Sequence, residues 1–267
     1  MLRLRIFTAV VLGALLVALL LYASPVVAGL VLGLIMVVGA WEWSGFLRLE
    51  SALLRGGYVV LLVGIALLGQ WQLAATGPFM QLMLLTLLWW LLALCWIVIA
   101  PARASALGAA LAGVLALVPA WLALVRIDST WPRGGEWTLF ILMLAFAADT
   151  GAFFAGRYFG RVRLAPRVSP GKTWEGVIGG VLAAGVVGLG GAVWFAQPAG
   201  VFVPLCLGAA ALSVVGDLTE SLLKRRAGLK DSGRFFPGHG GVLDRIDSVT
   251  SAAPAMAAGL VWLGVGA

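Results

Sequence analysis

Charged residues are scarce in this sequence. Only 11% of its 267 residues are Asp, Glu, Lys or Arg, whereas a typical soluble domain has about 25%. Hydrophobic residues make up 62% of the chain, and its mean hydropathy is +1.07. A soluble fold of this length cannot bury so much apolar surface. The composition therefore excludes an ordinary soluble enzyme, a disordered chain and a collagen-like fibre.

Cysteine and histidine are also rare. The two cysteines, Cys95 and Cys206, lie far apart within apolar runs. That pattern is typical of buried packing residues rather than of a disulfide framework. The single histidine, His239, excludes a zinc site built from paired Cys and His ligands.

Long stretches without charge indicate membrane spans. Turn-forming residues interrupt them at 24–25, 76–78 and 197–198, where we expect one helix to end and the next to begin. A span needs about 20 residues. We therefore predict an all-α polytopic membrane protein with about nine transmembrane helices, at residues 6–23, 25–41, 58–75, 79–100, 104–125, 137–154, 177–196, 201–218 and after 247.

The whole chain is expected to form a single integral membrane domain, 1–267. Residues 1–136 would provide scaffold spans, and 137–267 the catalytic spans and cytoplasmic loops. The first 24 residues, which include Arg3 and Arg5, also resemble a signal peptide. Because their apolar run is long for such a peptide and more spans follow, we interpret them as the first helix.

The distribution of basic residues predicts the orientation. With nine spans and a cytoplasmic N-terminus, 16 of the 18 Lys and Arg residues lie on the cytoplasmic side, and Arg126 and Arg133 lie outside. The positive-inside rule favours this orientation. Topology and contacts with anionic headgroups then explain the net charge of +7, and no nucleic acid partner is expected.

The charges are concentrated in two predicted cytoplasmic segments. Of 29 charged residues, 18 lie within 149–175 and 217–247. The segments hold eleven cations: Arg157, Arg161, Arg163, Arg167, Lys172, Lys224, Arg225, Arg226, Lys230, Arg234 and Arg245. The positive-inside rule alone explains these cations but not the Asp, Gly and Ser residues among them. A polyanion bound together with a divalent metal explains both.

Asp149 and Asp217 interrupt apolar runs near the membrane. If the helix continues past Asp217, then Glu220, Ser221 and Lys224 share one face with it, which suits a metal–phosphate site. Two other interpretations stay open, namely helix ends that reach the lipid headgroups and a solvated salt-bridged face.

Asp244 and Asp247 are three residues apart, so a helix would place both carboxylates on one face. Such hard oxygen ligands suit Mg²⁺, which commonly takes one or two carboxylates together with substrate phosphates. His239 precedes them among glycines that include Gly240 and Gly241. Glycines let backbone N–H groups approach a ligand closely, although a lone histidine is often structural.

Two familiar motifs are absent. Gly171-Lys172-Thr173 looks like the end of a P-loop, but Pro166 occupies the position of the required first glycine. The aspartate pattern of the CDP-alcohol phosphotransferases is also missing.

The second charged segment reads Ser221-Leu-Leu-Lys-Arg225, then Lys230-Asp-Ser-Gly233, then Phe236-Pro-Gly-His-Gly-Gly-Val-Leu-Asp-Arg-Ile-Asp247. Over 27 residues it resembles the signature of the phosphatidate cytidylyltransferases, or CDP-diacylglycerol synthases.

The first charged segment is similar to the same family through Asp149-Thr-Gly151, Gly156-Arg157 and the run from Ser169 to Gly176. One departure is Gly171, where many members carry lysine, so one phosphate contact fewer is expected. The nine-span layout fits the family, and the N-terminal half resembles it by hydropathy only.

The resemblance implies transfer of CMP from CTP to phosphatidate, which gives CDP-diacylglycerol and pyrophosphate, with Mg²⁺ as cofactor. The partners would be CTP, phosphatidate and membrane lipids, in a bacterial-type inner membrane with the active site on the cytoplasmic side. A homodimer is compatible with the family.

The family pattern assigns a role to each candidate residue. The residues expected to act in catalysis are Asp217, Lys224, Asp244 and Arg245. Metal ligands are expected first at Asp217 and Asp244, then at Asp149, Asp231 and Asp247. The residues expected to bind or enclose the phosphates are Ser169, Lys172, Thr173, Ser221, Arg225, Lys230, His239, Gly240 and Gly241.

Three other functions use similar features. A CTP-dependent lipid kinase would move the γ-phosphoryl group to a lipid alcohol. A secondary transporter would place ionisable groups near the bilayer midplane, whereas here they cluster on one side. A structural or assembly protein of the membrane would tolerate loss of the aspartates.

Overall fold

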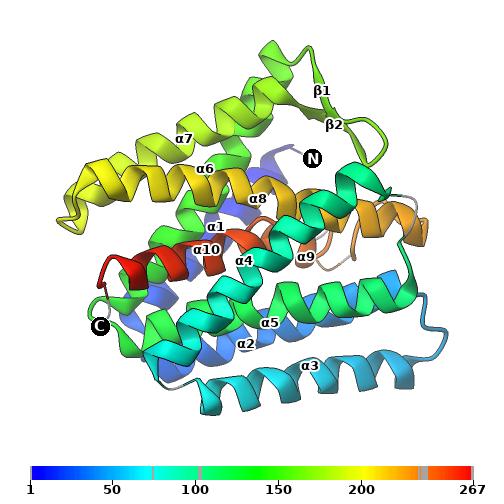
Figure 1. The fold of residues 1–267 in the computed structure, drawn as a ribbon, viewed down its shortest axis with the longest axis horizontal. Coiled ribbons are helices and arrows are strands. Elements are labelled where there is room, and N and C mark those ends of the chain that lie inside the picture. Colours follow the sequence, from blue (N-terminus) through cyan, green and yellow to red (C-terminus); the bar gives the residue numbers. More distant parts are fainter. Residues whose placement is uncertain (1, 74, 102–103, 234, 236–239, 266–267) are drawn as a thin grey trace.

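The computed structural model describes residues 2–73, 75–101, 104–233, 235 and 240–265. Its helices pack in one bundle (Figure 1). They are α1 (Leu2–Tyr22), α2 (Pro25–Ser44), α3 (Ala52–Gln72), α4 (Thr76–Ile99), α5 (Ala106–Thr130), α6 (Gly134–Phe159), α7 (Trp174–Trp194), α8 (Ala199–Ala227), α9 (Leu243–Ile246) and α10 (Val249–Trp262), with a short 3₁₀ turn, η1 (Gly45–Leu47). Helices α4 and α6 cross the other long helices at a clear angle (Figure 1).

The predicted all-α membrane fold is confirmed, but the count of nine spans is not. Among the described residues, seven helices are long and apolar enough to cross a membrane, namely α2 to α8. In α1, the apolar stretch that the structure describes covers Val10–Tyr22. Helix α10 has 14 residues, which correspond to about 21 Å of helix. A bilayer core is about 30 Å thick, so α10 is shorter than the ninth span expected after residue 247.

Local chemistry explains where several helices begin. The hydroxyls of Ser24, Ser51 and Ser105 accept hydrogen bonds from the backbone N–H groups of Val27, Leu54 and Gly108. Each satisfies a donor that a helix leaves open at its first turn. The predicted breaks near 24 and 197 coincide with observed gaps between helices, whereas Thr76, Gly77 and Pro78 form the first turn of α4, just after the gap that follows α3.

A small β-hairpin was not predicted. Strands β1 (Arg163–Ala165) and β2 (Ser169–Thr173) pair antiparallel between α6 and α7. Glu175 accepts hydrogen bonds from the backbone N–H groups of Arg161 and Val162, at 3.1 and 3.2 Å, and so closes the base of the hairpin. The hairpin lies at the edge of the bundle, where α6 ends and α7 begins (Figure 1).

Small residues let α6 and α7 pack closely. A Cβ atom at Gly151 would lie 2.6 Å from the Cβ of Ala183, and one at Gly180 would lie 2.6 Å from the carbonyl of Ala148. A Cβ at Gly179 would overlap Ala155. Close helix contact through small residues is the usual way in which helices associate in a bilayer.

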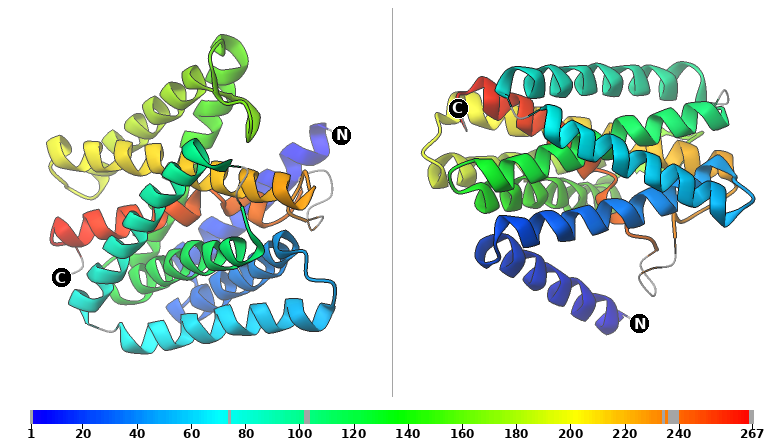
Figure 2. Two further views of the ribbon diagram at one scale, coloured as in Figure 1. Left: turned by 45° about the vertical axis from the view of Figure 1, so that its right-hand side comes forward. Right: turned by 90° about the horizontal axis from the view of Figure 1, so that it is seen from below.

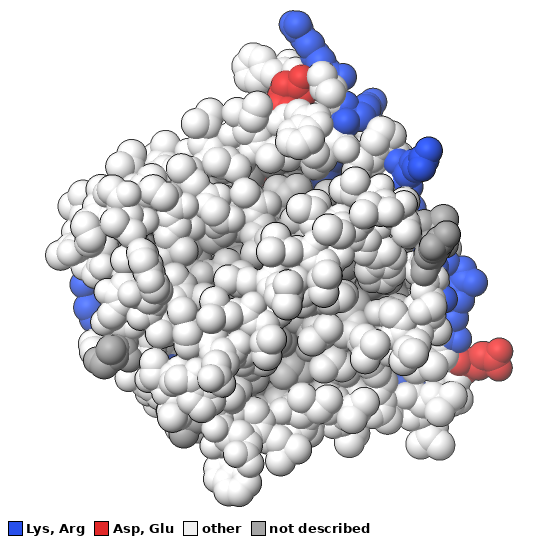
Figure 3. Space-filling model, in the orientation of Figure 1, with Lys and Arg blue, Asp and Glu red and all other residues white. Residues whose placement is uncertain are grey.

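The charged side chains gather at one end of the bundle. Figure 3 shows most of the blue and red atoms along its right-hand rim, with a small blue patch at the opposite rim. Arg48, after α2, contacts the carbonyl of Arg226 near the end of α8. At the opposite end, Arg133 donates to the carbonyl of Trp194 at 3.3 Å. Figure 2 shows that α1 also begins toward the side on which α8 ends.

Candidate active site

A cavity of about 610 Å³ lies at the charged end, between α6, β2, α7, α8 and α9. Seven of the predicted site residues line it: Asp149, Lys172, Thr173, Asp217, Asp244, Arg245 and Asp247. The rest of the lining is largely small or apolar and includes Ala152, Val177, Gly180, Ala210 and Val214. One cavity therefore joins a charged wall to an apolar wall.

The α8 face expected from the sequence is present. The helix continues ten residues past Asp217, to Ala227, and carries Glu220, Ser221 and Lys224 on one stripe. Ser221 donates a hydrogen bond to Asp217 Oδ1 at 3.3 Å. Lys224 and its neighbours lie in the last turn of the helix, where cations interact favourably with the helix dipole.

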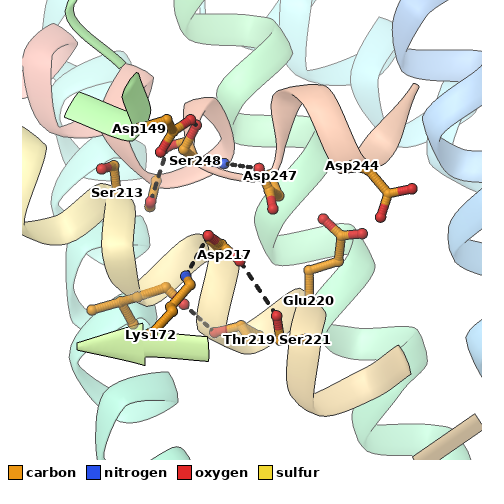
Figure 4. Close-up of polar contacts among 12 residues, drawn as sticks. Asp149, Lys172, Ser213, Asp217, Thr219, Glu220, Ser221, Asp244, Asp247 and Ser248 are labelled. Atoms are coloured by element: carbon orange, nitrogen blue, oxygen red, sulfur yellow. Dashed lines mark hydrogen bonds and ion pairs between the residues drawn. The ribbon is translucent and has the colours of Figure 1, made fainter. Parts of the chain in front are cut away.

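Asp149 and Asp217 approach one another from different helices (Figure 4). Asp149 lies within α6, ten residues before the helix ends, and accepts a hydrogen bond from Ser248 at 2.7 Å. Asp217 forms an ion pair with Lys172 of β2. The hairpin therefore brings a cation from the first charged segment to a carboxylate of the second.

Asp244 is held by several donors. Lys224 Nζ lies 2.6 Å from its Oδ1, and the backbone N–H groups of Ser232 and Gly241 donate to its Oδ2 at 3.0 and 2.8 Å. Burial alone would raise the pKa of Asp244, but the hydrogen bonds from Lys224, Gly241 and Ser232 outweigh it and hold the pKa below its ordinary value.

Asp244 lies in α9, whereas Asp247 directly follows that helix and lies in a different environment. Its Oδ1 accepts the backbone N–H of Ser248 at 2.8 Å. Burial raises the pKa of Asp247 well above its ordinary value, and the nearby charges of Asp217 and Glu220 raise it further. The two aspartates therefore differ in their hydrogen-bond donors and in the direction of their pKa shifts, despite their spacing of three residues.

Glu220 lies beneath these carboxylates and is only 1% exposed. Lys224 Nζ lies 3.1 Å from its Oε1. Its Oε2 has no hydrogen-bond donor among the described residues. A buried acceptor without a donor is costly unless a proton or a cation satisfies it.

Thr173 has a structural role in β2 and α7. Its hydroxyl accepts the backbone N–H of Gly176 at 3.1 Å and so caps α7. Ser169, at the start of β2, is partly buried. The phosphate-binding roles of both stay predictions.

Other predicted residues lie outside the cavity lining. Arg225, Lys230 and Asp231 are exposed around the end of α8. At Gly240, φ is +81°, and a Cβ there would lie 2.6 Å from Asp244 Oδ2, so a glycine is required. His239 lies outside the described residues.

The sequence interpretation did not select Glu42, Ser232 or Ser248. Ser248 contacts Asp149. Ser232 and Glu42 hydrogen-bond each other at 3.1 Å although 190 residues separate them. The one visible signal for Glu42 is a carboxylate between two tryptophans in an apolar run.

Within the described residues, no group of three or more His, Cys, Asp or Glu side chains could by itself hold a metal ion. A site completed by substrate phosphates needs fewer protein ligands. The oxygen-rich lining therefore suits a hard cation that shares its coordination with a ligand.

Known proteins resemble this chain over nearly its whole length. A model of the Cytidylyltransferase family matches residues 3–263. A protein of Pseudomonas aeruginosa named phosphatidate cytidylyltransferase is 40% identical over 271 residues, which cover 98% of this chain and 97% of the relative. A Haemophilus influenzae protein of the same name is 38% identical over 281 residues, covering 95% and 96%. The chain therefore belongs to the Cytidylyltransferase family.

Proposed function

We propose that the chain transfers CMP from CTP to phosphatidate, releasing pyrophosphate and forming CDP-diacylglycerol. As a cytidylyltransferase it is a nucleotidyltransferase enzyme, and the relatives matched along the whole chain are named for this reaction. The observation that carries the proposal is the cavity in which charged residues of α8, α9 and β2 meet an apolar wall from α6 and α7. A lipid with a phosphate headgroup needs both surfaces.

The reaction needs no nucleophile from the protein. A phosphate oxygen of phosphatidate attacks the α-phosphorus of CTP, a new P–O bond forms, and the bond to pyrophosphate breaks. The substrate already carries the negative charge of the nucleophile. Catalysis then consists mainly of positioning two anions and stabilising the charge on pyrophosphate.

The cations of the site suit that task. Lys172 in β2 pairs with Asp217 (Figure 4), and Lys224 in α8 pairs with Asp244. Arg245 also lines the cavity. Arg225 and Lys230 lie exposed nearby and would meet the outer phosphates of CTP as it enters. Each cation would neutralise charge on the triphosphate or on the lipid headgroup.

The carboxylates fit a divalent metal such as Mg²⁺. Asp217, Asp247 and Asp149 present oxygen donors to the cavity, and Glu220 Oε2 lies beneath them without a hydrogen-bond donor among the described residues. When bound, the ion would lower the repulsion between the two anionic substrates and stabilise charge on the leaving group. Asp244 already accepts bonds from Lys224, Ser232 and Gly241, so only its Oδ1 would have a lone pair left for a metal.

We place the site on the cytoplasmic face of a bacterial-type inner membrane. The charged end of the bundle carries the cavity (Figure 3), and the positive-inside rule puts such an end in the cytoplasm. CTP is water-soluble, whereas the acyl chains of phosphatidate stay in the bilayer. A site at this surface reaches both substrates. A homodimer remains a prediction.

The test is the acceptor preference of the purified full-length protein in mixed micelles with CTP and Mg²⁺. Phosphatidate should give CDP-diacylglycerol, and diacylglycerol should give no product. Phosphorylation of diacylglycerol would instead identify a CTP-dependent lipid kinase. The absence of both reactions, together with uptake of a solute by vesicles containing the protein, would favour a transporter.

A further inference from the structure

Glu42 is a buried carboxylate in the scaffold half of the chain. It lies near the end of α2 and is 6% exposed. Its donors come from the opposite half. Ser232 Oγ and the backbone N–H of Leu243 donate to Oε2 at 3.1 and 2.7 Å. The backbone N–H of Val242 donates to Oε1 at 3.1 Å. Both carboxylate oxygens are therefore used as acceptors, and all three donors are neutral.

The hydrogen bonds of Ser232 connect Glu42 to Asp244, which lines the cavity. Ser232 Oγ accepts the backbone N–H of Asp244 at 3.3 Å, and its own backbone N–H donates to Asp244 Oδ2 at 3.0 Å. Asp244 in turn accepts from Lys224 at 2.6 Å. One residue, Ser232, therefore separates Glu42 from the Asp244–Lys224 pair.

Two glycines leave room for the Glu42 side chain. A Cβ atom at Gly233 or at Gly241 would overlap the Glu42 carboxylate, and at Gly241 it would also overlap Ser232 Oγ. The backbone on both sides of residues 234–239 thus lies directly against this side chain. Gly241, predicted to shape a phosphate loop, also gives Glu42 its space.

We propose that Glu42 is a positioning residue for cytidylyl transfer. It fixes residues 240–244 so that Asp244 and Lys224 face the triphosphate of CTP. The inference rests on the proposed function, because it assigns that triphosphate to the cavity. Glu42 itself does not line the cavity, so its effect passes through Ser232 and Asp244.

The main test compares Glu42→Gln with the wild type in the purified full-length protein. Glutamine has the same shape but turns one acceptor into a donor, so at least one of the three donors loses its partner. We expect kcat to fall by about 10- to 100-fold, and KM for CTP to rise about fivefold or more. KM for phosphatidate should stay within about twofold of wild type, because the apolar wall is unchanged.

The control is Glu50→Gln. Glu50 is an exposed carboxylate in the loop after α2, and its variant should keep wild-type constants. A role limited to joining the two halves would lower the yield or the melting temperature of Glu42→Gln and leave both KM values of the folded protein unchanged. That result would overturn the proposal.

Ser232→Ala decides the question if Glu42→Gln does not fold. Ser232 lies outside the long helices, and its variant removes the direct link between Glu42 and Asp244. KM for CTP should rise without a change for phosphatidate. Where both single variants fold, the double variant should lose little more than Glu42→Gln alone, because the two residues act through one link. Unchanged KM for CTP in Ser232→Ala, or fully additive losses, would contradict the proposal.

The wild-type measurement separates this inference from the proposed function. If wild-type protein does not form CDP-diacylglycerol, the proposed function fails. If it does, while Glu42→Gln keeps the wild-type KM for CTP and kcat, only the role of Glu42 fails.

Discussion

At the scale of single residues, the carboxylates of the cavity differ in what their oxygens contact. Asp217 is paired with Lys172, whereas Asp244 is held by Lys224 and two backbone N–H groups. Asp247 accepts a backbone N–H and lies close to other acids. Substitution of each should therefore have its own kinetic effect.

Asp217→Asn should lower turnover by about 100-fold, since it removes one carboxylate charge from the wall that would hold the metal. The side chain keeps its size, so the protein should stay folded. Turnover measured over a range of Mg²⁺ concentrations tests this, with Glu50→Gln as control. An Asp217→Asn variant with wild-type turnover and wild-type Mg²⁺ dependence would contradict the role.

Asp244→Asn should also remove most activity, for a different reason. An amide at this position places a donor against Lys224, Ser232 or Gly241, all of which now donate to the carboxylate. We expect the melting temperature to fall as well as turnover, unlike in Asp217→Asn. Thermal unfolding in detergent, measured beside the assay, distinguishes the two variants, and equal melting temperatures would argue against this difference.

The sequence predicted the main acidic and basic residues of the cavity because the charges stand out in an apolar chain. It could not predict Glu42, whose partners Ser232 and Leu243 lie about 200 positions away. It also gave Asp244 and Asp247 equivalent places on one helix face. Their different hydrogen-bond donors depend on tertiary contacts that spacing does not contain.

At the scale of elements, serine and proline marked the breaks near 24 and 197 correctly, whereas Gly77 and Pro78 lie in the first turn of α4. The hairpin was missed because β2 contains Pro170 and Gly171, residues that disfavour strands. Glu175 closes the base of the hairpin through the backbone N–H groups of Arg161 and Val162, and Thr173, the last residue of β2, caps α7. A ninth span was expected after residue 247, but a charge-free stretch does not reveal where its helix begins and ends, and α10 has 14 residues.

Gly179→Ala should weaken the α6–α7 contact, because its Cβ would overlap Ala155. Overpacking of this kind costs about 1–3 kcal/mol, so the melting temperature should fall by several degrees. Gly190→Ala is the matched control on the same helix, since a Cβ there meets nothing within 4 Å. Equal melting temperatures for the two variants would show that close approach at Gly179 is not needed.

At the scale of the whole molecule, charge is divided between the two ends of the bundle. Arg48 and Arg226 meet at the end that carries the cavity. At the other end, Arg133 donates to the carbonyl of Trp194 and to the carboxylate of Glu136. The low charge of the sequence thus reflects an apolar scaffold around one dense charged site.

Cysteine labelling tests the orientation. In a chain with Cys95 and Cys206 replaced by Ala, a membrane-impermeant maleimide should label Ser129→Cys in intact bacterial cells. Glu50→Cys should react only after the membrane is opened. Both positions are exposed and lie at opposite ends of the bundle. The reverse pattern would place the cavity on the outer face.

The most direct measurement follows the α-phosphate of CTP. Purified wild-type protein is given phosphatidate, Mg²⁺ and CTP labelled at the α-phosphorus, and both the lipid fraction and pyrophosphate are quantified. We predict that label enters the lipid in equal amount to the pyrophosphate released, because one P–O bond forms as the other breaks. Label that stays in CDP or CTP, with none in the lipid, would contradict the account.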